Sequence, residues 1–203
     1  MINTRNIPTL KEKISLKVLG KYYPSWGYGN ELTKWYVMAY KRSKEVSSEE
    51  IKNGATDDFF YNGKLNKGVK FSYVFDHFRR EISKGIKELE IKGTTMIIAA
   101  PNSNPDFCYK TDTNQVLINE NLQTEKCNIP KERMVKRTRP LPPAHSYGRI
   151  LEIEQFRTMG LDMITNETEP ENIIVYDDIK TKGIQIMSMV KLLKTKYPKT
   201  KYY

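Results

Sequence analysis

The chain has little cysteine, histidine or tryptophan: its 203 residues include two of each. Cys108 and Cys127 stand apart, without the close spacing of a metal-binding pair. Neither a cysteine zinc site nor a disulfide-stapled scaffold is therefore expected. A reduced, cytoplasmic protein fits this composition best.

The sequence also lacks long apolar stretches. Nowhere do about 18 apolar residues follow one another, as a membrane-spanning helix would need. Residues 1–13 alternate polar and basic side chains without the apolar segment of a secretion signal. We therefore expect a soluble protein without a membrane partner.

Acidic residues are fewer than basic ones, 24 against 34, which gives a formal net charge of +10. From Ile179 to Tyr203 there is no acidic residue, whereas seven lysines occur. This excess predicts an anionic partner, either a polyphosphate substrate or a nucleic acid. A lysine-rich solvated surface explains the same composition. The length fits one domain, or a core with a smaller accessory region.

The segment from Glu171 to Leu193 changes its pattern three times. An apolar run at 173–176 predicts a parallel strand covered on both faces, and two carboxylates, Asp177 and Asp178, follow it. Apolar residues then return at helical spacing from 186 onward. The free N–H groups at the start of such a helix suit a phosphate. A surface turn with an acidic tip explains the same residues without a ligand.

The run from Val175 to Gln185 resembles the phosphoribosyl-diphosphate signature of type I phosphoribosyltransferases. In that signature an apolar strand precedes two acidic residues, an apolar residue, any residue and then Thr-Thr-Gly-x-Thr. The matching residues are Asp177, Asp178, Ile179, Thr181 and Gly183. Lys182 and Gln185 depart from the pattern, because the family commonly has threonine at both positions. A lysine can still hold a phosphate as a point charge. More distantly, Tyr22-Tyr23-Pro24 and the helix that follows resemble the opening of ComF-like phosphoribosyltransferases.

This resemblance implies an α/β fold, with a parallel sheet and flanking helices over residues 86–203. Residues 1–85 would form an N-terminal hood over the strand ends. The first core strand is expected at 94–100 and the second within 132–140. After the helix that follows the signature, residues 200–203 would supply a stub of another strand. A homo- or hetero-oligomer could then complete the sheet edge.

The remaining elements are expected from apolar periodicity. Helices are predicted at 32–40, 71–90 and 111–126, with a weaker one at 150–159. Residues 43–70 are polar and turn-rich, with Asn53-Gly54 and Asn62-Gly63 as the strongest turn signals, and are expected to be an insertion-like connection. His77 lies off the apolar stripe of its helix and is expected to be solvated.

The resemblance also assigns roles to site residues. Asp177 and Asp178 would bind the ribose hydroxyls, favour a cationic ribose in the transition state and lie near a Mg²⁺ held mostly by water and substrate. The 5′-phosphate would be held by Lys180, Thr181, Lys182, Gly183, Ile184 and Gln185.

Three further sets of residues would complete the site. Asn102 and Ser103 follow the first core strand, where the family binds diphosphate, although a plain turn explains them equally. Arg137 and Arg139 would face the diphosphate from the second strand. Their alternatives are a solvated basic patch and a nucleic-acid contact. Arg149 lies in the segment matching the family's flexible catalytic loop; His145 and Arg157 are weaker candidates there.

The function that follows is an enzyme of nucleotide metabolism, a phosphoribosyltransferase of the glycosyltransferase class. It would bind phosphoribosyl diphosphate with magnesium, release diphosphate and transfer phosphoribosyl to an acceptor, which is a base, a nucleotide or a nucleic acid. One alternative is a non-catalytic, nucleotide-responsive regulator that binds nucleic acid. Another is a toxin or antiviral effector built on the same fold.

Overall fold

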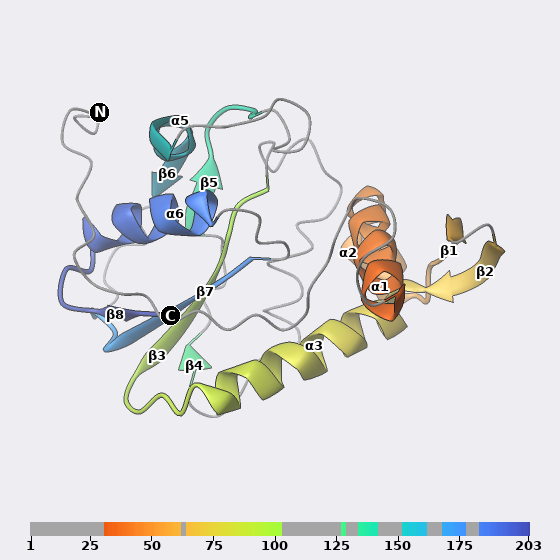
Figure 1. Cartoon of the computed structure of the whole chain (residues 1–203), viewed down its shortest axis with the longest axis horizontal. Coiled ribbons are helices and arrows are strands. Elements are labelled where there is room, and N and C mark those ends of the chain that lie inside the picture. Colours follow the sequence, from red (N-terminus) through yellow and green to blue (C-terminus); the bar gives the residue numbers. More distant parts are fainter. Residues whose placement is uncertain are drawn as a thin grey trace.

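The structure is a computed structural model and describes residues 31–61, 64–102, 127–128, 134–141, 152–161, 168–177 and 183–203. Figure 1 shows the elements in these ranges. The helices are α1 (Glu31–Arg42), the 3-10 turn η1 (Ser43–Glu45), α2 (Ser48–Lys52), α3 (Phe71–Glu88), α5 (Glu152–Arg157) and α6 (Ile184–Lys194). The strands are β1 (Thr56–Tyr61), β2 (Lys64–Lys70), β3 (Thr95–Ala99), β4 (Cys127–Asn128), β5 (Val135–Arg137), β6 (Met159–Leu161), β7 (Asn172–Tyr176) and β8 (Lys201–Tyr202).

The central feature is a four-stranded parallel sheet in the order β4-β3-β7-β8. Its two middle strands, β3 and β7, are the continuous apolar runs of the sequence, and Ile97 lies opposite Ile174 in the register. The earlier strand β3 stands beside β7, with β4 on its other side. The strand order therefore reverses between β3 and β7, which makes their carboxyl ends a topological switch point.

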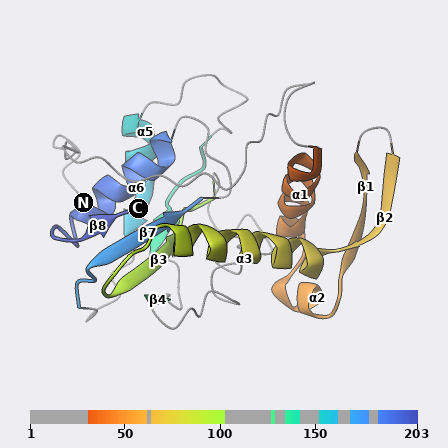
Figure 2. The same ribbon diagram turned by 60° about the horizontal axis from the view of Figure 1, so that its bottom comes forward.

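Each face of the sheet is covered by helices (Figure 2). Met96, Ile98 and Ile173 are buried in one cluster with the apolar side of α6, including Met189. On the other face, Ile97, Ala99 and Ile174 are buried in a second cluster with Ile82 of α3. The chain is thus a mixed α/β structure with a small parallel sheet between helical layers.

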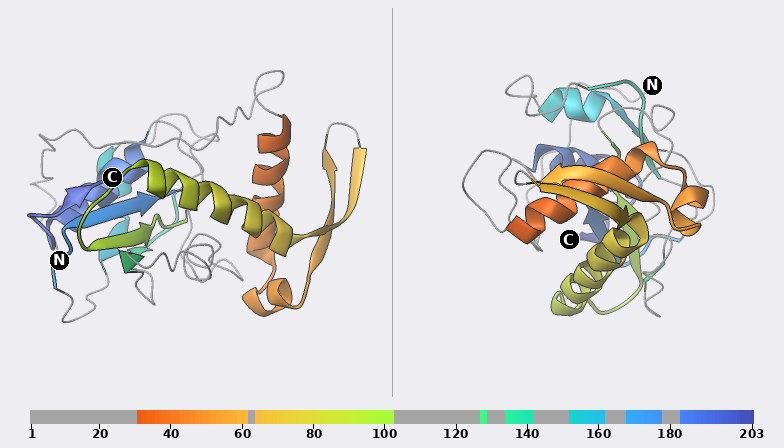
Figure 3. Two further views of the ribbon diagram at one scale, coloured as in Figure 1. Left: turned by 90° about the horizontal axis from the view of Figure 1, so that it is seen from below. Right: turned by 90° about the vertical axis from the view of Figure 1, so that its right-hand side faces the viewer.

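The first half of α3 extends past the sheet and carries the N-terminal elements. Its Phe71 and Phe75 are buried against Tyr40 of α1. Figures 2 and 3 show α1, α2, β1 and β2 gathered at this end of α3, on the side of the sheet toward which β3 and β7 run. The division into a hood at residues 1–85 and a core at 86–203 stays a prediction. The boundary at residues 85 and 86 falls inside the continuous helix α3.

Several predictions from periodicity are confirmed. The helices at 32–40, 71–90, 150–159 and around 186–193 correspond to α1, α3, α5 and α6. The strands at 94–100 and 173–176 are β3 and β7, and the stub at 200–203 is β8, paired in parallel with β7. The helix predicted at 111–126 lies outside the described residues.

One prediction is incomplete and one is wrong. The insertion-like connection at 43–70 contains regular elements that were not predicted, α2 and the antiparallel pair β1–β2. The segment at 132–140 does contain a strand, β5, but this strand pairs antiparallel with β6, and β4 takes the position beside β3. The buried apolar residues of this segment are Met134 and Val135. Two apolar residues are too few to indicate which strand β5 pairs with. Among the described helices, none is long and apolar enough to cross a membrane.

Candidate functional site

The candidate site lies at the carboxyl ends of β3 and β7, where the strand order reverses. Beyond the last ladder pair, the N–H of Ala100 donates to the carbonyl oxygen of Tyr176 at 2.7 Å. This bond holds Pro101 and Asn102, which follow β3, beside Asp177, which follows β7. Ligands of open parallel sheets bind in the crevice outside such strand ends.

The amino end of α6 borders the same place. Gly183 precedes the helix in the left-handed conformation, at φ 72° and ψ 7°, which a residue with a Cβ rarely adopts. The N–H of Met187 donates to the carbonyl oxygen of Gly183 at 2.9 Å and closes the first turn. The earlier N–H groups have no partner within the helix, and no acidic side chain stands in this turn. The helix therefore presents its positive end toward the loop that precedes it.

Gln185 joins this helix to the end of β3. Its Nε2 donates to the carbonyl oxygen of Pro101 at 2.7 Å, and its Oε1 accepts from Nη2 of Arg137 at 3.4 Å. The glutamine that departs from the family signature is therefore used inside the protein. It holds the first turn of α6 against the loop after β3.

Arg137 connects three parts of the site from β5. The residue is 4% exposed. Its Nε donates to the carbonyl oxygen of Asn102 at 3.1 Å, and its Nη1 donates to Oε1 of Gln155 at 3.1 Å and to Oγ1 of Thr158 at 2.7 Å. A guanidinium offers five donors in a fixed fork, so one side chain fixes β3, α5 and α6 together. By contrast, Arg139 is exposed.

The side chain of Asn102 is buried without hydrogen bonds. The residue is 4% exposed, and neither its Nδ2 nor its Oδ1 has a partner in the part of the chain that the structure describes. Leaving a buried polar group unpaired costs about 1–3 kcal/mol. Such a group at a candidate ligand site is available to bond a ligand, and a carboxamide can both donate and accept.

The structure thus brings together four sequence-predicted parts of the site: Asn102, Arg137, Asp177 and the segment 183–185. Asp177 is half-buried at the end of β7. Arg157 lies exposed at the end of α5. The remaining candidates lie outside the described residues: Ser103, His145, Arg149, Asp178, Lys180, Thr181 and Lys182.

Sequence reasoning missed Gln155 and Thr158, which orient the Arg137 guanidinium. Both residues are buried polar side chains of α5 and its last turn. Only their place on the inner side of a weakly amphipathic helix could have indicated them.

The described residues could hold a magnesium ion only if substrate and water supplied most of its ligands. Among the described residues there is no group of three histidine, cysteine or carboxylate side chains. Asp177 offers one carboxylate at the strand end, which suits an ion that takes one or two carboxylates and completes its shell with phosphate oxygens and water.

A second cluster, between α1 and α3, contains His77. Its imidazole is half-buried and is stacked on the Tyr36 ring, with centroids 3.6 Å apart, so one face of the ring is covered and the side chain is only partly solvated. Burial lowers the pKa of His77. Burial and the hydrogen bond that Tyr36 donates to the Tyr73 hydroxyl, at 3.1 Å, raise the pKa of Tyr36 to about 12. This cluster fastens α1 to α3.

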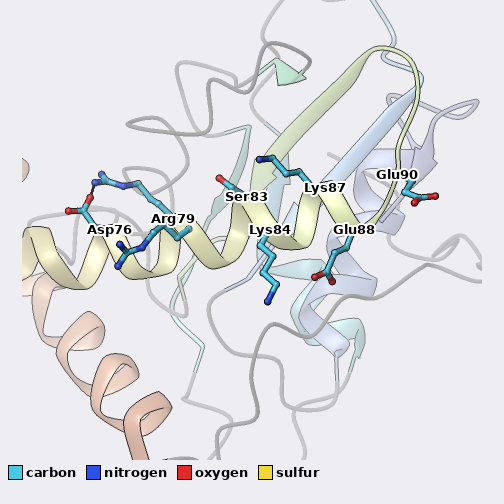
Figure 4. Close-up of a pocket in the computed structure, with 8 residues that line it drawn as sticks. Asp76, Arg79, Ser83, Lys84, Lys87, Glu88 and Glu90 are labelled. Atoms are coloured by element: carbon cyan, nitrogen blue, oxygen red, sulfur yellow. Dashed lines mark ion pairs between the residues drawn. The ribbon is translucent and has the colours of Figure 1, made fainter.

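A shallow groove runs along α3 (Figure 4). Figure 4 shows its side chains spread along the helix and pointing in different directions. Its lining residues are Asp76, Arg79, Arg80, Ser83, Lys84, Lys87, Glu88 and Glu90. Arg79 and Asp76 form an ion pair, and the other cations are interleaved with Glu88 and Glu90. This mixture of charges does not favour an anion, so the groove is not the phosphate site.

Comparison with known proteins gives no match to a family model, to a curated protein or to a solved structure.

Proposed function

We propose that the chain binds phosphoribosyl diphosphate at the carboxyl ends of β3 and β7 and transfers its phosphoribosyl group to an acceptor. One observation carries the proposal. The β7–Asp177 end and the Gly183–α6 start stand at the topological switch point, beside the buried, partnerless carboxamide of Asn102.

The proposed chemistry is a displacement at C1 of the ribose. The bond from C1 to the diphosphate oxygen breaks, the oxygen leaves with its electron pair, and the acceptor forms the new bond to C1. Asp177 and Asp178 accept hydrogen bonds from the ribose hydroxyls, and their charge favours the cation-like ring. Magnesium, when bound with the substrate, neutralises the diphosphate.

The phosphate contacts divide between backbone and side chains. The first N–H groups of α6 and the positive end of that helix face the 5′-phosphate. Because the Gln185 carboxamide already bonds Pro101 and Arg137, it is not assigned to the phosphate. Lys180, Thr181 and Lys182 supply the remaining contacts, with Lys182 acting as a point charge in place of the family's hydroxyl.

The leaving diphosphate is assigned to the end of β3. The carboxamide of Asn102 gains there the partners that it lacks, and Ser103 follows it in the chain. The role of Arg137 is to position this end of β3, because its guanidinium is buried and bonded to the Asn102 carbonyl.

The experiment is a diphosphate-release assay with phosphoribosyl diphosphate, magnesium and a panel of bases, nucleotides and RNA. Release that depends on one acceptor, and that is lost in the Asp177→Asn/Asp178→Asn double variant, supports a transferase. Absence of release with every acceptor, while the ligand still binds, would leave a nucleotide-responsive binding protein and refute the transfer step.

A further inference from the structure

The antiparallel pair β1–β2 projects from the molecule as a two-stranded ribbon. Figures 1 and 3 show it beyond α1, at the end of α3 farthest from the parallel sheet. No residue of β2 is buried: each is exposed or half-exposed. Among the described elements the ribbon pairs with no further strand. A surface of this kind is available to a partner.

A bulge sets which residues of the ribbon face outward. Asp57 pairs with Val69 and Phe59 pairs with Asn66, so Asp58 alone stands opposite Lys67 and Gly68. Gly68 has φ 61°, a left-handed conformation that glycine adopts readily. Its N–H donates to Oδ1 of Asp58 at 2.7 Å. The extra residue shifts the alternation of β2 by one position.

The shift gives the ribbon an inner and an outer face. On the inner face, Asn66 accepts a hydrogen bond from Nε1 of Trp35 at 3.2 Å, and Val69 packs against the apolar cluster of α1 and α3. Lys67 and Lys70 lie on the outer face and are exposed. Leu65, which pairs with Phe60, is 43% exposed on the same face.

The lysines of β2 carry positive charge that is not neutralised by ion pairs among the described residues. Lys64, Lys67 and Lys70 are exposed, and the structure shows no ion pair for their ammonium groups within the described ranges. The two carboxylates of β1, those of Asp57 and Asp58, already have other partners. Asp57 is paired with Arg42, whose Nη2 donates to Oδ1 at 3.0 Å, and Asp58 accepts from Gly68.

We propose that the β1–β2 ribbon docks into the major groove of a nucleic-acid duplex, with Lys67 and Lys70 of its outer face on the phosphates. The major groove of B-DNA, about 12 Å wide, admits a two-stranded ribbon. Residues three apart on a strand are separated by about 10 Å, from a rise of roughly 3.3 Å per residue. Lys67 and Lys70 are therefore far enough apart to reach different phosphates. This inference does not rest on the transferase activity.

The test measures binding of the full chain to a fluorescent 20-base-pair DNA duplex, by anisotropy, between about 50 and 200 mM salt. The variant is Lys64→Gln/Lys67→Gln/Lys70→Gln. Each phosphate contact contributes about 0.9 to the slope of log affinity against log salt. We expect the variant to lower the slope by about 1.8, the contribution of Lys67 and Lys70, and the affinity at 100 mM salt at least tenfold.

The matched control is Lys92→Gln/Lys199→Gln/Lys201→Gln, which removes the same charge from exposed residues at the amino ends of the parallel strands. It should keep the parent's slope to within the contribution of one contact. A Lys64→Arg/Lys67→Arg/Lys70→Arg variant, which keeps the charge, should bind as the parent does. The weaker binding of the glutamine variant is then due to its lost charge and not to a change in the side chains' packing or in folding.

Three results would overturn the proposal. The parent could fail to bind the duplex at 50 mM salt, or the ribbon and control variants could lose affinity equally. The parent could also bind a single strand of the same sequence, or polyglutamate, as tightly as the duplex; the surface would then be a general polyanion binder.

Discussion

Two buried asparagines differ in their hydrogen bonds, and this difference gives the first prediction. Asn102, 4% exposed, has no partner for either side-chain atom. Asn172, 3% exposed, donates from Nδ2 to the carbonyl oxygen of Lys92 at 2.8 Å. Asn102→Ala should therefore leave the stability of the free protein nearly unchanged and remove the rise in melting temperature caused by phosphoribosyl diphosphate with magnesium.

Asn172→Ala is the matched control. It should lower the free energy of unfolding by about 1 kcal/mol, the net worth of a hydrogen bond, and keep the rise in melting temperature with the ligand. Thermal melts of both variants with and without ligand provide the measurement. If Asn102→Ala keeps the full ligand response, its carboxamide does not contact the ligand.

Arg137 gives a second prediction at the residue scale. Lysine has one ammonium and cannot reproduce the guanidinium fork, so Arg137→Lys loses at least one of the bonds to Asn102, Gln155 and Thr158. We expect a loss of roughly 1.5–3 kcal/mol in the free energy of unfolding, measured with urea. The exposed Arg139→Lys should change it by less than about 0.5 kcal/mol. Equal effects of the two substitutions would contradict the role given to Arg137.

His77 gives a pH prediction. Burial lowers its pKa in the folded protein, Glu81 raises it and Arg80 lowers it further. The pKa in the unfolded chain is near the ordinary value of about 6.5, so the unfolded state binds the proton more tightly. The contribution of neutral His77 to stability is complete above that value and is lost as the pH falls through it.

The measurement compares urea unfolding of the parent and of His77→Phe, which keeps a ring against Tyr36, at pH 7.5 and pH 5. The stability difference between the two proteins should shift in favour of His77→Phe at the lower pH. A difference that stays constant would mean that His77 titrates normally.

At the scale of elements, the start of α6 depends on one glycine. Gly183 has φ 72°, where a residue with a Cβ costs about 1–2 kcal/mol. Gly183→Ala should lower the free energy of unfolding by this amount, measured with urea. Gly183→Asn should lower it less, because asparagine tolerates the left-handed conformation better. If both variants lose the same free energy of unfolding, the loss comes from crowding around the added Cβ and not from the left-handed backbone conformation.

The elements that sequence reasoning found are those with one dominant signal. α3 has a clear apolar stripe, and β3 and β7 are short, continuous apolar runs. The ribbon β1–β2 was missed although the sequence Asn62-Gly63 separates its strands, because apolar and polar residues do not alternate regularly along β2. Its bulge at Gly68 and its two largely exposed faces remove the period-2 pattern that indicates a strand.

The candidate site was predictable where it depended on local chain order. The strand, Asp177, Gly183 and the helix follow one another within a dozen residues, so the sequence indicated their arrangement. The bonds of Arg137 to Asn102 and Gln185 join residues separated by 35 and 48 positions. Such contacts depend on how β5 packs, and the parallel pairing expected for that strand was wrong.

At the scale of the whole molecule, the lysines near the C-terminus and those of the ribbon have different surroundings. Two lysines of the last quarter lie against aromatic rings: the ammonium of Lys194 lies 5.6 Å from the Tyr202 ring centroid and that of Lys196 lies 5.0 Å from the Tyr197 ring centroid. The ribbon at the other end of α3 carries lysines without such contacts. The candidate phosphate site and the proposed nucleic-acid surface are therefore distinct parts of the molecule, and each can be removed by substitution without the other.

The most direct test of the central claim is calorimetric titration of phosphoribosyl diphosphate, with magnesium, into the parent and into Asp177→Asn/Asp178→Asn. The proposed site predicts one ligand per chain for the parent and loss of measurable binding in the double variant, with the melting temperature of the free variant unchanged or raised. Equal affinity of the two proteins, or no heat of binding to a folded parent, would contradict the assignment of this site to phosphoribosyl diphosphate.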